Sequence, residues 1–256
     1  MDREAYKIFA TLEHRHWWFL GRRKLYGALL RDVLTRDRGA PPADLTVLDV
    51  GCGTGGFLGE LGRLGRVVGL EMESAAIEHC RGQGFTDTLV ARCDAVPLAA
   101  GCADVACLFD VLEHTPDDVA VLREVRRSLA PGGHVAVSVP AYQFLFAHND
   151  RTAHHFRRYT RGRLLKALRE AGFEVRRATY VNVLLGLFIV PAVLLFKLKE
   201  RVFGPPSAPG ANNLTVRTPR LLNALFAKIF AGERHVLRHV SSPFGHSVFA
   251  VARNPG

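Results

Sequence analysis

Four glycines within six residues make the part of this sequence best suited to holding a ligand. The stretch Gly51-Cys52-Gly53-Thr54-Gly55-Gly56 follows an apolar run at 45–50 and leads into a segment with helical spacing. Glycines let the backbone turn tightly and approach a ligand, and the free N–H groups at a helix start attract polar or negative groups. The spacing also satisfies the G-x-G-x-x-G pattern of dinucleotide sites. We therefore predict a cofactor site here, and the loop alone leaves its occupant open.

Two acidic residues follow the next predicted strands and could complete such a site. Glu71 ends the apolar run at 66–70, twenty residues after Gly51. In a doubly wound sheet an acid at this place can accept hydrogen bonds from both ribose hydroxyls. Asp94 follows a third, shorter strand, where it could meet an adenine amino group or cap a turn.

A histidine after the predicted strand at 104–109 is the first candidate for a general base. His114 lies where open α/β sheets bind ligands, beyond the carboxyl end of a strand. A structural or helix-capping histidine is the alternative. Asp110, Glu113 and His114 are also compatible with a divalent metal, but three such donors are not diagnostic, and we predict no metal.

A second polar cluster follows the predicted strand at 134–139. Two of its histidines, His148 and His155, are further candidates for the base, and Arg157 and Arg158 could clamp a phosphate or carboxylate. An exposed polar loop without a ligand is the alternative. The whole cluster comprises His148, Asp150, His154, His155, Arg157, Arg158 and Tyr159.

Short apolar runs alternate with helical segments after residue 44, which is typical of βαβ units. We predict an α/β fold with a doubly wound, Rossmann-like, mostly parallel seven-stranded sheet. Ser74 is expected to cap the second helix of this region, and Pro116 to lie in the first turn of the third. The predicted strands are 45–50, 66–70, 88–91, 104–109, 134–139, 173–181 and 246–253, and the predicted helices are 3–36, 55–64, 74–81, 116–129 and 160–171.

Length and composition indicate a folded chain with additions to one α/β domain. With 256 residues, 48% of them hydrophobic, the chain can bury a large core, which excludes disorder. The five cysteines form no C-x-x-C pair, and the first 13 residues lack an apolar stretch, so we expect reduced thiols and a cytoplasmic protein. We predict an N-terminal helical cap at 1–40, a cofactor domain at 41–182, a helical insertion at 183–240 and the last strand at 241–256.

The basic residues are concentrated in the second part of the chain. Residues 1–150 carry a net charge of −4, and residues 151–256 carry +14. An uncharged apolar run at 183–196 lies in this part, with Lys197, Lys199 and Arg201 directly after it. Such a segment suits peripheral contact with an anionic membrane through 183–201, or else a buried helix or a dimer interface. A mobile loop at 204–219 and an amphipathic helix at 221–230 are expected to follow.

Five segments between residues 45 and 140 share order and spacing with one known family. They are VLDVGCGTGGF (47–57), VVGLE (67–71), RCDAVPL (92–98), LFDVLEH (108–114) and LAPGGHVAVSVP (129–140). The chain thereby resembles the class I S-adenosylmethionine-dependent methyltransferases, in the branch that includes the ubiquinone-biosynthesis type. The segments HWWFLGRRKL (16–25) and HNDRTAHHFRRYTRGRL (148–164) resemble one branch of small-molecule methyltransferases.

The resemblance implies S-adenosyl-L-methionine as the cofactor and assigns roles to individual residues. Asp49 and the glycine loop would hold its methionine and ribose parts, Glu71 its ribose hydroxyls, and Asp94 its adenine amine. Arg22 would reach its carboxylate, and Asp110 with Val111 would line it near the sulfonium. The residues expected to bind the cofactor are Arg22, Asp49, Gly51, Cys52, Gly53, Gly55, Glu71, Met72, Asp94, Ala95, Asp110 and Val111; those expected to bind the acceptor are Trp18, Asp150, Arg158 and Tyr159.

We therefore expect methyl transfer to a small, hydrophobic or lipid-linked acceptor, with oxygen favoured over nitrogen or carbon. A methyltransferase of RNA or protein is one alternative. No Pro-Pro-aromatic motif follows Asp110, and no RNA-binding module is visible, so no nucleic-acid partner is expected. A nicotinamide oxidoreductase is another, although no Tyr-x-x-x-Lys pair occurs. A non-catalytic cofactor-binding or scaffold protein is the third, and the oligomeric state stays open.

Overall fold

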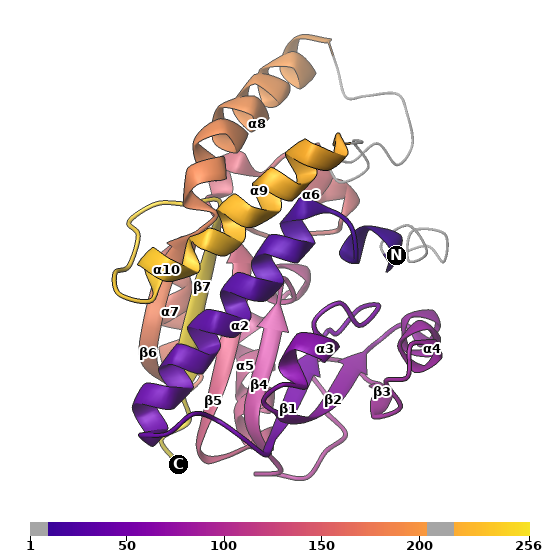
Figure 1. Ribbon diagram of the computed structural model, residues 1–256, viewed down its shortest axis with the longest axis vertical. Helices are drawn as coiled ribbons and strands as arrows, with labels where there is room; N and C mark the ends of the chain where they lie inside the picture. The colour runs from indigo at the N-terminus through magenta and orange to yellow at the C-terminus, as the bar shows by residue number, and fades with distance from the viewer. Residues whose placement is uncertain (1–9, 204–217) are drawn as a thin grey trace.

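The computed structural model describes residues 10–203 and 218–256 and contains one seven-stranded sheet (Figure 1). Its strand order is β3-β2-β1-β4-β5-β7-β6. The first five strands run parallel, and β7 pairs antiparallel with β5 on one side and β6 on the other. This confirms the predicted fold class. The strands are β1 (Leu45–Val50), β2 (Gly65–Glu71), β3 (Thr88–Val90), β4 (Ala103–Phe109), β5 (Leu129–Pro140), β6 (Glu174–Val181) and β7 (Ser247–Arg253).

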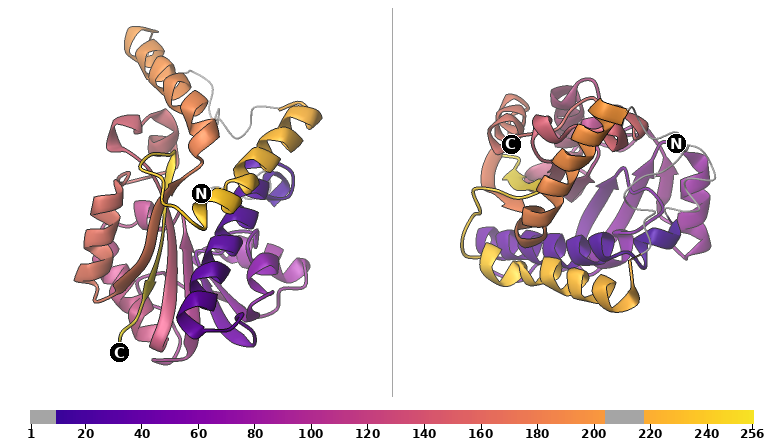
Figure 2. Two further views of the ribbon diagram at one scale, coloured as in Figure 1. Left: turned by 60° about the vertical axis from the view of Figure 1, so that its left-hand side comes forward. Right: turned by 90° about the horizontal axis from the view of Figure 1, so that it is seen from above.

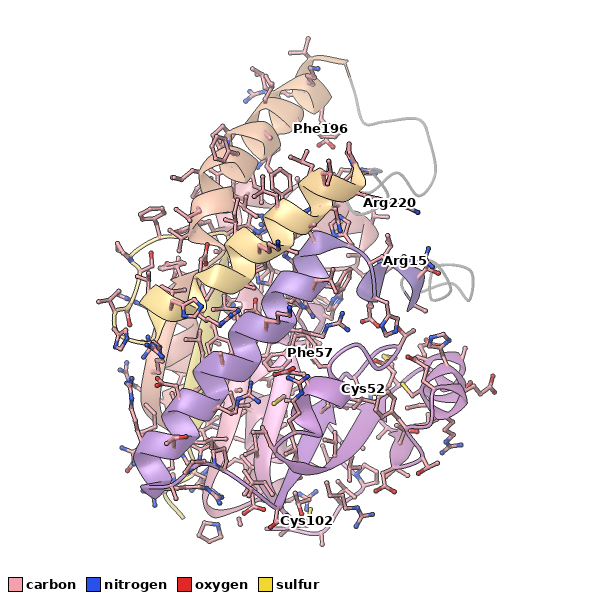
Figure 3. The ribbon with its side chains drawn as sticks, viewed as in Figure 1. Arg15, Cys52, Phe57, Cys102, Phe196 and Arg220 are labelled. Atoms are coloured by element: carbon pink, nitrogen blue, oxygen red, sulfur yellow. The ribbon has the colours of Figure 1, made fainter. Side chains whose placement is uncertain are left out.

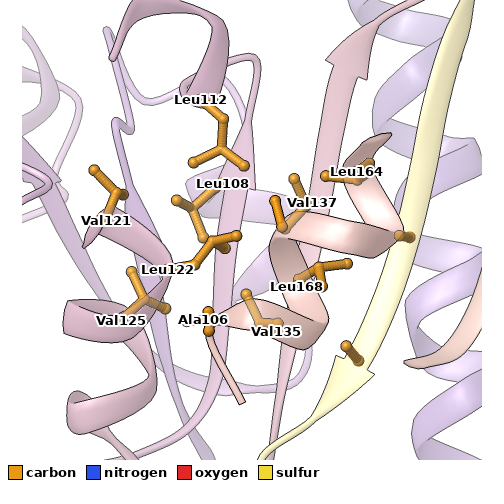
Figure 4. Close-up of a cluster of buried hydrophobic side chains, with 14 of the residues drawn as sticks. Ala106, Leu108, Leu112, Val121, Leu122, Val125, Val135, Val137, Leu164 and Leu168 are labelled. Atoms are coloured by element: carbon orange, nitrogen blue, oxygen red, sulfur yellow. The ribbon is translucent and has the colours of Figure 1, made fainter. Parts of the chain in front are cut away.

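Helices cover both faces of the sheet. On one face lie α2 (Trp17–Arg38), α9 (Arg220–Gly232) and α10 (Arg234–Leu237), with α9 running beside α2 (Figures 1 and 2). On the other face lie α5 (Asp118–Ser128), which packs on β5, and α7 (Arg161–Glu170), which packs on β6, β7 and α5, and Figure 4 shows apolar side chains of these helices beside those of β4 and β5. The short α3 (Leu58–Leu61) and α4 (Ser74–Gly82) accompany β1, β2 and β3.

Both faces of the sheet are buried, and this explains why the central strands are apolar throughout and do not alternate between apolar and polar residues. Side chains of β4 and β5 that face α5 and α7, such as Leu108 and Val137, are fully buried. Those that face α2, such as Cys107 and Ala136, are fully buried as well. A parallel sheet covered on both faces requires such continuous apolar runs.

Several helix boundaries differ from the sequence prediction. The helix expected at 55–64 contracts to α3, because Gly55 has a φ of +93° and the loop continues to Phe57. Ser74 is the first residue of α4 and not its cap, which is Glu73. α5 begins after Asp117, whose side chain accepts a hydrogen bond from the Ala120 N–H, so Pro116 lies before the helix. The expected helix 3–36 is interrupted at 14–16 before α2, and its residues 3–9 lie outside the described residues.

The apolar run at 183–196 forms the first part of α8 (Val183–Phe203), which projects from the body of the molecule (Figures 1 and 2). Its middle part packs through Val193 on Leu145 and Ala147, near η2 (Gln143–Leu145) and α6 (His148–Thr152). The expected alternative of a helix buried against the sheet is wrong, because most of its large apolar side chains are exposed. In the described part of the chain, no helix has the length and hydropathy needed to cross a membrane. The loop expected at 204–219 lies mostly outside the described residues.

Candidate active site

The glycine loop lies beyond the carboxyl end of β1, packs closely at Gly51 and leaves more space at Gly53. Gly51 has a φ of +76°, and a Cβ there would come 2.5 Å from Cγ2 of Val111. Only glycine combines this backbone conformation with that close approach. Gly53 also has a positive φ, but around its Cβ position the nearest atom is Oε1 of Glu13, at 3.9 Å. In Figure 3, Cys52 and Phe57 mark this loop and Arg15 marks the turn before α2.

Glu71 ties the glycine loop to the end of β2. Its Oε2 accepts a hydrogen bond from the Gly53 N–H at 3.1 Å, and its Oε1 accepts one from the Met72 N–H at 2.8 Å. The carboxylate is half-buried and keeps acceptor capacity for a further donor. Asp94 is exposed and pairs with Arg92, whose hydrogen bond holds the pKa of Asp94 below its ordinary value. Met72 and Ala95 are exposed beside these acids.

Asp49 is a buried carboxylate with an oxygen that lacks a hydrogen-bond partner. The residue is 3% exposed, and its Oδ2 has no hydrogen-bond partner. Burial raises the pKa of Asp49 to about 7, and the carboxylates of Glu13 and Glu71 add to this against the opposing charge of Arg22. A buried polar group without a partner costs free energy, so the site is suited to a ligand that brings a donor or a positive charge.

Arg22 and Asp110 form a buried ion pair between α2 and the end of β4. Nη1 of Arg22 donates to Oδ2 of Asp110, and the Ser138 hydroxyl donates to the other oxygen at 3.2 Å. The Arg22 guanidinium lies 4.1 Å from the ring centroid of Trp18 and 5.0 Å from that of Phe57. Its Nε is buried without a partner. Arg22 is therefore held in place while its Nε can still donate to another acceptor.

A second charged group lies at the carboxyl ends of β4 and β5. Asp150 is 1% exposed, and its carboxylate accepts hydrogen bonds from Nδ1 of His155 and Nε of Arg158, both at 2.8 Å. Burial alone would raise the pKa of Asp150, but these two bonds outweigh it and hold the pKa below its ordinary value. The His155 ring meets the His114 ring edge to face, with centroids 4.6 Å apart.

His114 completes this group from η1 (Leu112–His114), directly after β4. Desolvation, together with the neighbouring His155, lowers the pKa of His114 to about 4, although the residue is exposed at the surface. The imidazole is therefore neutral at physiological pH. Glu113, His114 and His155 also bring one ligand atom each within 4.8 Å of one another, an oxygen and two nitrogens of the kind that binds zinc and similar ions.

The structure places His148 and Tyr159 apart from this group and buries Arg158 with Asp150 inside it. His148 lines a surface hollow of about 510 Å³ at the far part of α8, with Arg151, Lys197, Glu200 and Arg201. Tyr159 is fully buried in the core, and its hydroxyl donates to Asp118 at 2.8 Å. Arg158 and Asp150 are buried against each other. The expected acceptor contacts of Tyr159, Arg158 and Asp150 are therefore replaced by contacts that hold the site from within.

Three polar residues that the sequence analysis did not single out also face this edge of the sheet. Asn182 follows β6 and His246 precedes β7, and neither the Asn182 amide nor Nδ1 of His246 has a hydrogen-bond partner. Burial lowers the pKa of His246 to about 4, and the charge of Arg158 contributes. The third, Glu13, covers the glycine loop. The polar Asn182, directly after the apolar end of β6 at Tyr180 and Val181, was a usable signal, whereas nothing in the local sequence marks Glu13.

These features together fit an adenosine-containing cofactor that carries both an ammonium and a carboxylate group. The glycine loop, the half-buried Glu71, the unpaired oxygen of Asp49 and the free Nε of Arg22 offer acceptors and a donor along one edge of the sheet. The fold is a Rossmann-like sheet with a site at the carboxyl ends of its central strands, which is where this class of protein binds its ligands.

Comparison with known proteins agrees with this class. A family model described as "Methyltransferase domain" matches residues 19–178. The ubiquinone biosynthesis O-methyltransferase of Thiobacillus denitrificans is 30% identical over 197 residues, which are 67% of this chain and 83% of that protein. The enzyme of that name from Pseudomonas paraeruginosa is 31% identical over 228 residues, covering 79% and 94%.

A solved S-adenosylmethionine-dependent methyltransferase from Thermotoga maritima shares the fold, with a TM-score of 0.54, 17% identity and 93% coverage of each chain. The chain belongs to the methyltransferase-domain family, and it is an S-adenosyl-L-methionine-dependent methyltransferase.

Proposed function

We propose that the protein transfers a methyl group to an oxygen of a small, hydrophobic or lipid-linked acceptor. The observation that carries this proposal is the contact of His155 with Asp150 and His114 at the carboxyl ends of β4 and β5. A hydroxyl acceptor must lose a proton as the methyl group arrives, and a positioned base contributes about 10²–10⁴-fold to such a step. Two relatives named as O-methyltransferases support the same acceptor class.

The cofactor site follows from the geometry of the glycine loop. When bound, S-adenosyl-L-methionine supplies a methyl group activated by its sulfonium. Glu71 would accept hydrogen bonds from the ribose hydroxyls. Arg22 would donate from its free Nε to the cofactor's carboxylate. The remaining contacts are assigned to the end of β1, to the loop backbone and to the residues after β2, β3 and β4: Asp49, Gly51, Cys52, Gly53, Gly55, Met72, Asp94, Ala95, Asp110 and Val111.

His155 is the base that the hydrogen bonds favour. Its Nδ1 is engaged by Asp150, which fixes the ring and leaves Nε2 to accept a proton. His114 is neutral and adjoins the same ring, so it can position the acceptor or share the proton. The free polar atoms of Asn182 and His246 would bind the polar end of the acceptor, and Trp18 would flank it. The protein must then hold the acceptor oxygen about 3–3.5 Å from the methyl carbon.

The exposed apolar residues of α8 and α9 supply the reason for a hydrophobic acceptor. We call this set the α8–α9 surface. Phe188 is 76% exposed and Leu221 88% exposed, and Lys197, Lys199 and Arg201 lie at the far part of α8. Apolar side chains with adjacent cations suit shallow insertion into an anionic leaflet. The set comprises Leu184, Leu187, Phe188, Leu194, Leu195, Phe196, Leu198 and Val202 from α8 and Leu221, Leu222 and Leu225 from α9.

The role of the base is tested by single substitutions assayed with isotopically labelled methyl donor and a lipid extract. We expect His155→Gln to lower methyl transfer by about 10²-fold or more, in line with loss of a general base. Cofactor binding measured by calorimetry should stay unchanged. The control is His235→Gln on α10, an exposed histidine far from the site. Equal rates for both variants would refute the proposed base, and labelled RNA or protein would refute the acceptor class.

Membrane contact is tested by sedimentation with vesicles. Replacing Leu187 and Phe188 by Ser should reduce binding to phosphatidylglycerol-containing vesicles by about 100-fold or more, since each side chain gives about 1.5–3 kcal/mol when buried. The control is Val236→Ser, an apolar residue 61% exposed on α10. Binding that is equally strong to neutral vesicles, or unchanged in the double variant, would contradict a role of the α8–α9 surface at an anionic membrane.

A further inference from the structure

Glu13 lies on the glycine loop although its own segment precedes α2. The residue is 8% exposed, and its Oε2 accepts a hydrogen bond from the Thr54 hydroxyl. A Cβ on Gly56 would come 2.7 Å from the carboxyl carbon of Glu13, so the loop leaves room for this side chain. Arg23 fixes the arrangement, because its two Nη atoms donate to the backbone oxygens of Gly56 and Glu13, each at 2.7 Å.

Glu13 and Asp49 are two buried carboxylates that interact electrostatically. Burial raises the pKa of Glu13 despite the Thr54 hydrogen bond and the charges of Arg22 and Arg23. The charge of Glu13 in turn contributes to the raised pKa of Asp49, whose Oδ2 has no partner. Arg22 is engaged by Asp110, and Arg23 by backbone oxygens. The pKa of both carboxyl groups stays raised although these arginines are near, so a further positive group from a ligand would be favourable here.

We propose that Glu13 and Asp49 together bind the α-ammonium group of S-adenosyl-L-methionine. The inference rests on the proposed cofactor role of the glycine loop. An ammonium group has three N–H donors, and its hydrogen bonds to carboxylates are charge-assisted. The space above Gly53, where the nearest atom to a Cβ would be Oε1 of Glu13, lies next to this carboxylate.

The same two carboxylates select against the alternative occupant of a G-x-G-x-x-G loop. A dinucleotide would bring its pyrophosphate to the glycine loop and the start of the following helix. Glu13 and Asp49 would oppose that negative charge at short range, in a region shielded from solvent. They thus act as specificity-determining residues for a cofactor that carries an amino-acid group, and the segment that carries Glu13 would lie over that end of the cofactor.

Calorimetry with two ligands tests this proposal. S-adenosyl-L-homocysteine carries the ammonium, and its deaminated analogue has hydrogen in that place. The wild-type protein should bind the first roughly 10- to 100-fold more tightly, as expected for a hydrogen bond to a charged group. Glu13→Gln should weaken binding of S-adenosyl-L-homocysteine by a similar factor and leave the analogue unaffected, so the discrimination collapses. Asp49→Asn should do the same.

The control is Glu78→Gln, an exposed residue on α4, which should keep the wild-type discrimination. If Glu13→Gln weakens both ligands equally, Glu13 only supports the loop and the inference is overturned. Unchanged affinity in both variants overturns it as well. If the wild-type protein binds neither ligand, the proposed cofactor site itself fails, and this outcome is distinct from the other two.

Discussion

Replacing Gly51 by alanine should destabilise the protein for two separable reasons. The residue has a φ of +76°, and its Cβ would lie 2.5 Å from Cγ2 of Val111. The left-handed backbone costs a non-glycine residue about 1–2 kcal/mol, and forcing an extra carbon into a packed site costs about 1–3 kcal/mol. The free energy of unfolding should therefore fall by about 2–5 kcal/mol. At about 2–4 °C per kcal/mol, Tm should fall by roughly 4–20 °C.

A double-mutant cycle separates the two contributions. Val111→Ala removes the methyl group that Gly51→Ala would meet, but it leaves the backbone strain in place. Gly51→Ala should therefore cost less in the Val111→Ala background, with a coupling free energy of about 1–3 kcal/mol. The assay is thermal unfolding followed by circular dichroism, with affinity for S-adenosyl-L-homocysteine measured in parallel.

Gly82→Ala provides the matched control. Gly82 ends α4 with nothing within 4 Å of its Cβ position and no positive φ, so alanine there should change stability by less than about 1 kcal/mol. If Gly51→Ala and Gly82→Ala unfold at the same temperature, the close packing of the loop on Val111 is wrong. Strict additivity in the double variant would refute the steric part of the reasoning.

Two substitutions of buried carboxylates should have opposite effects on stability. Asp150→Asn leaves Arg158 buried without its counter-charge and should cost about 3–5 kcal/mol by urea unfolding. Because hydrogen bonds outweigh burial and lower the pKa of Asp150, its stabilisation is present above pH 3.8 and is lost as pH falls further. The variant should lack this acid sensitivity. Asp49→Asn should instead stabilise the free protein by up to about 4 kcal/mol above pH 7 while weakening cofactor binding. Burial raises the pKa of Asp49 from 3.8 to about 7, so wild-type stability should fall over that pH range. A pH-independent difference between each variant and wild type would contradict these assignments.

The parts of the fold that depend on local spacing could be predicted from the sequence. The glycine loop, its preceding strand and Glu71 at the end of the next strand lie within one βαβ unit, so their relative places follow from the unit itself. The order of apolar runs and helical segments likewise predicted a mostly parallel sheet, because such units have few ways to pack.

The contacts that complete the site join distant parts of the chain and could not be predicted. Arg22 and Asp110 are 88 positions apart, and nothing in either segment indicates that they pair. His148 and His155 lie in one polar cluster of the sequence, yet one lines the hollow at α8 and the other meets His114. The burial of Tyr159 could not be predicted either, since its neighbours in the sequence are polar although its ring is fully buried in the fold.

The central claim is methyl transfer to a hydroxyl of a hydrophobic acceptor with His155 as base. The most direct measurement is mass spectrometry of a lipid extract incubated with the protein and S-adenosyl-L-methionine labelled in its methyl group. We predict a labelled O-methyl product in the organic phase, formed one for one with S-adenosyl-L-homocysteine and lost with His155→Gln. Label in nucleic acid or protein, or a labelled lipid product that His155→Gln leaves undiminished, would contradict the claim.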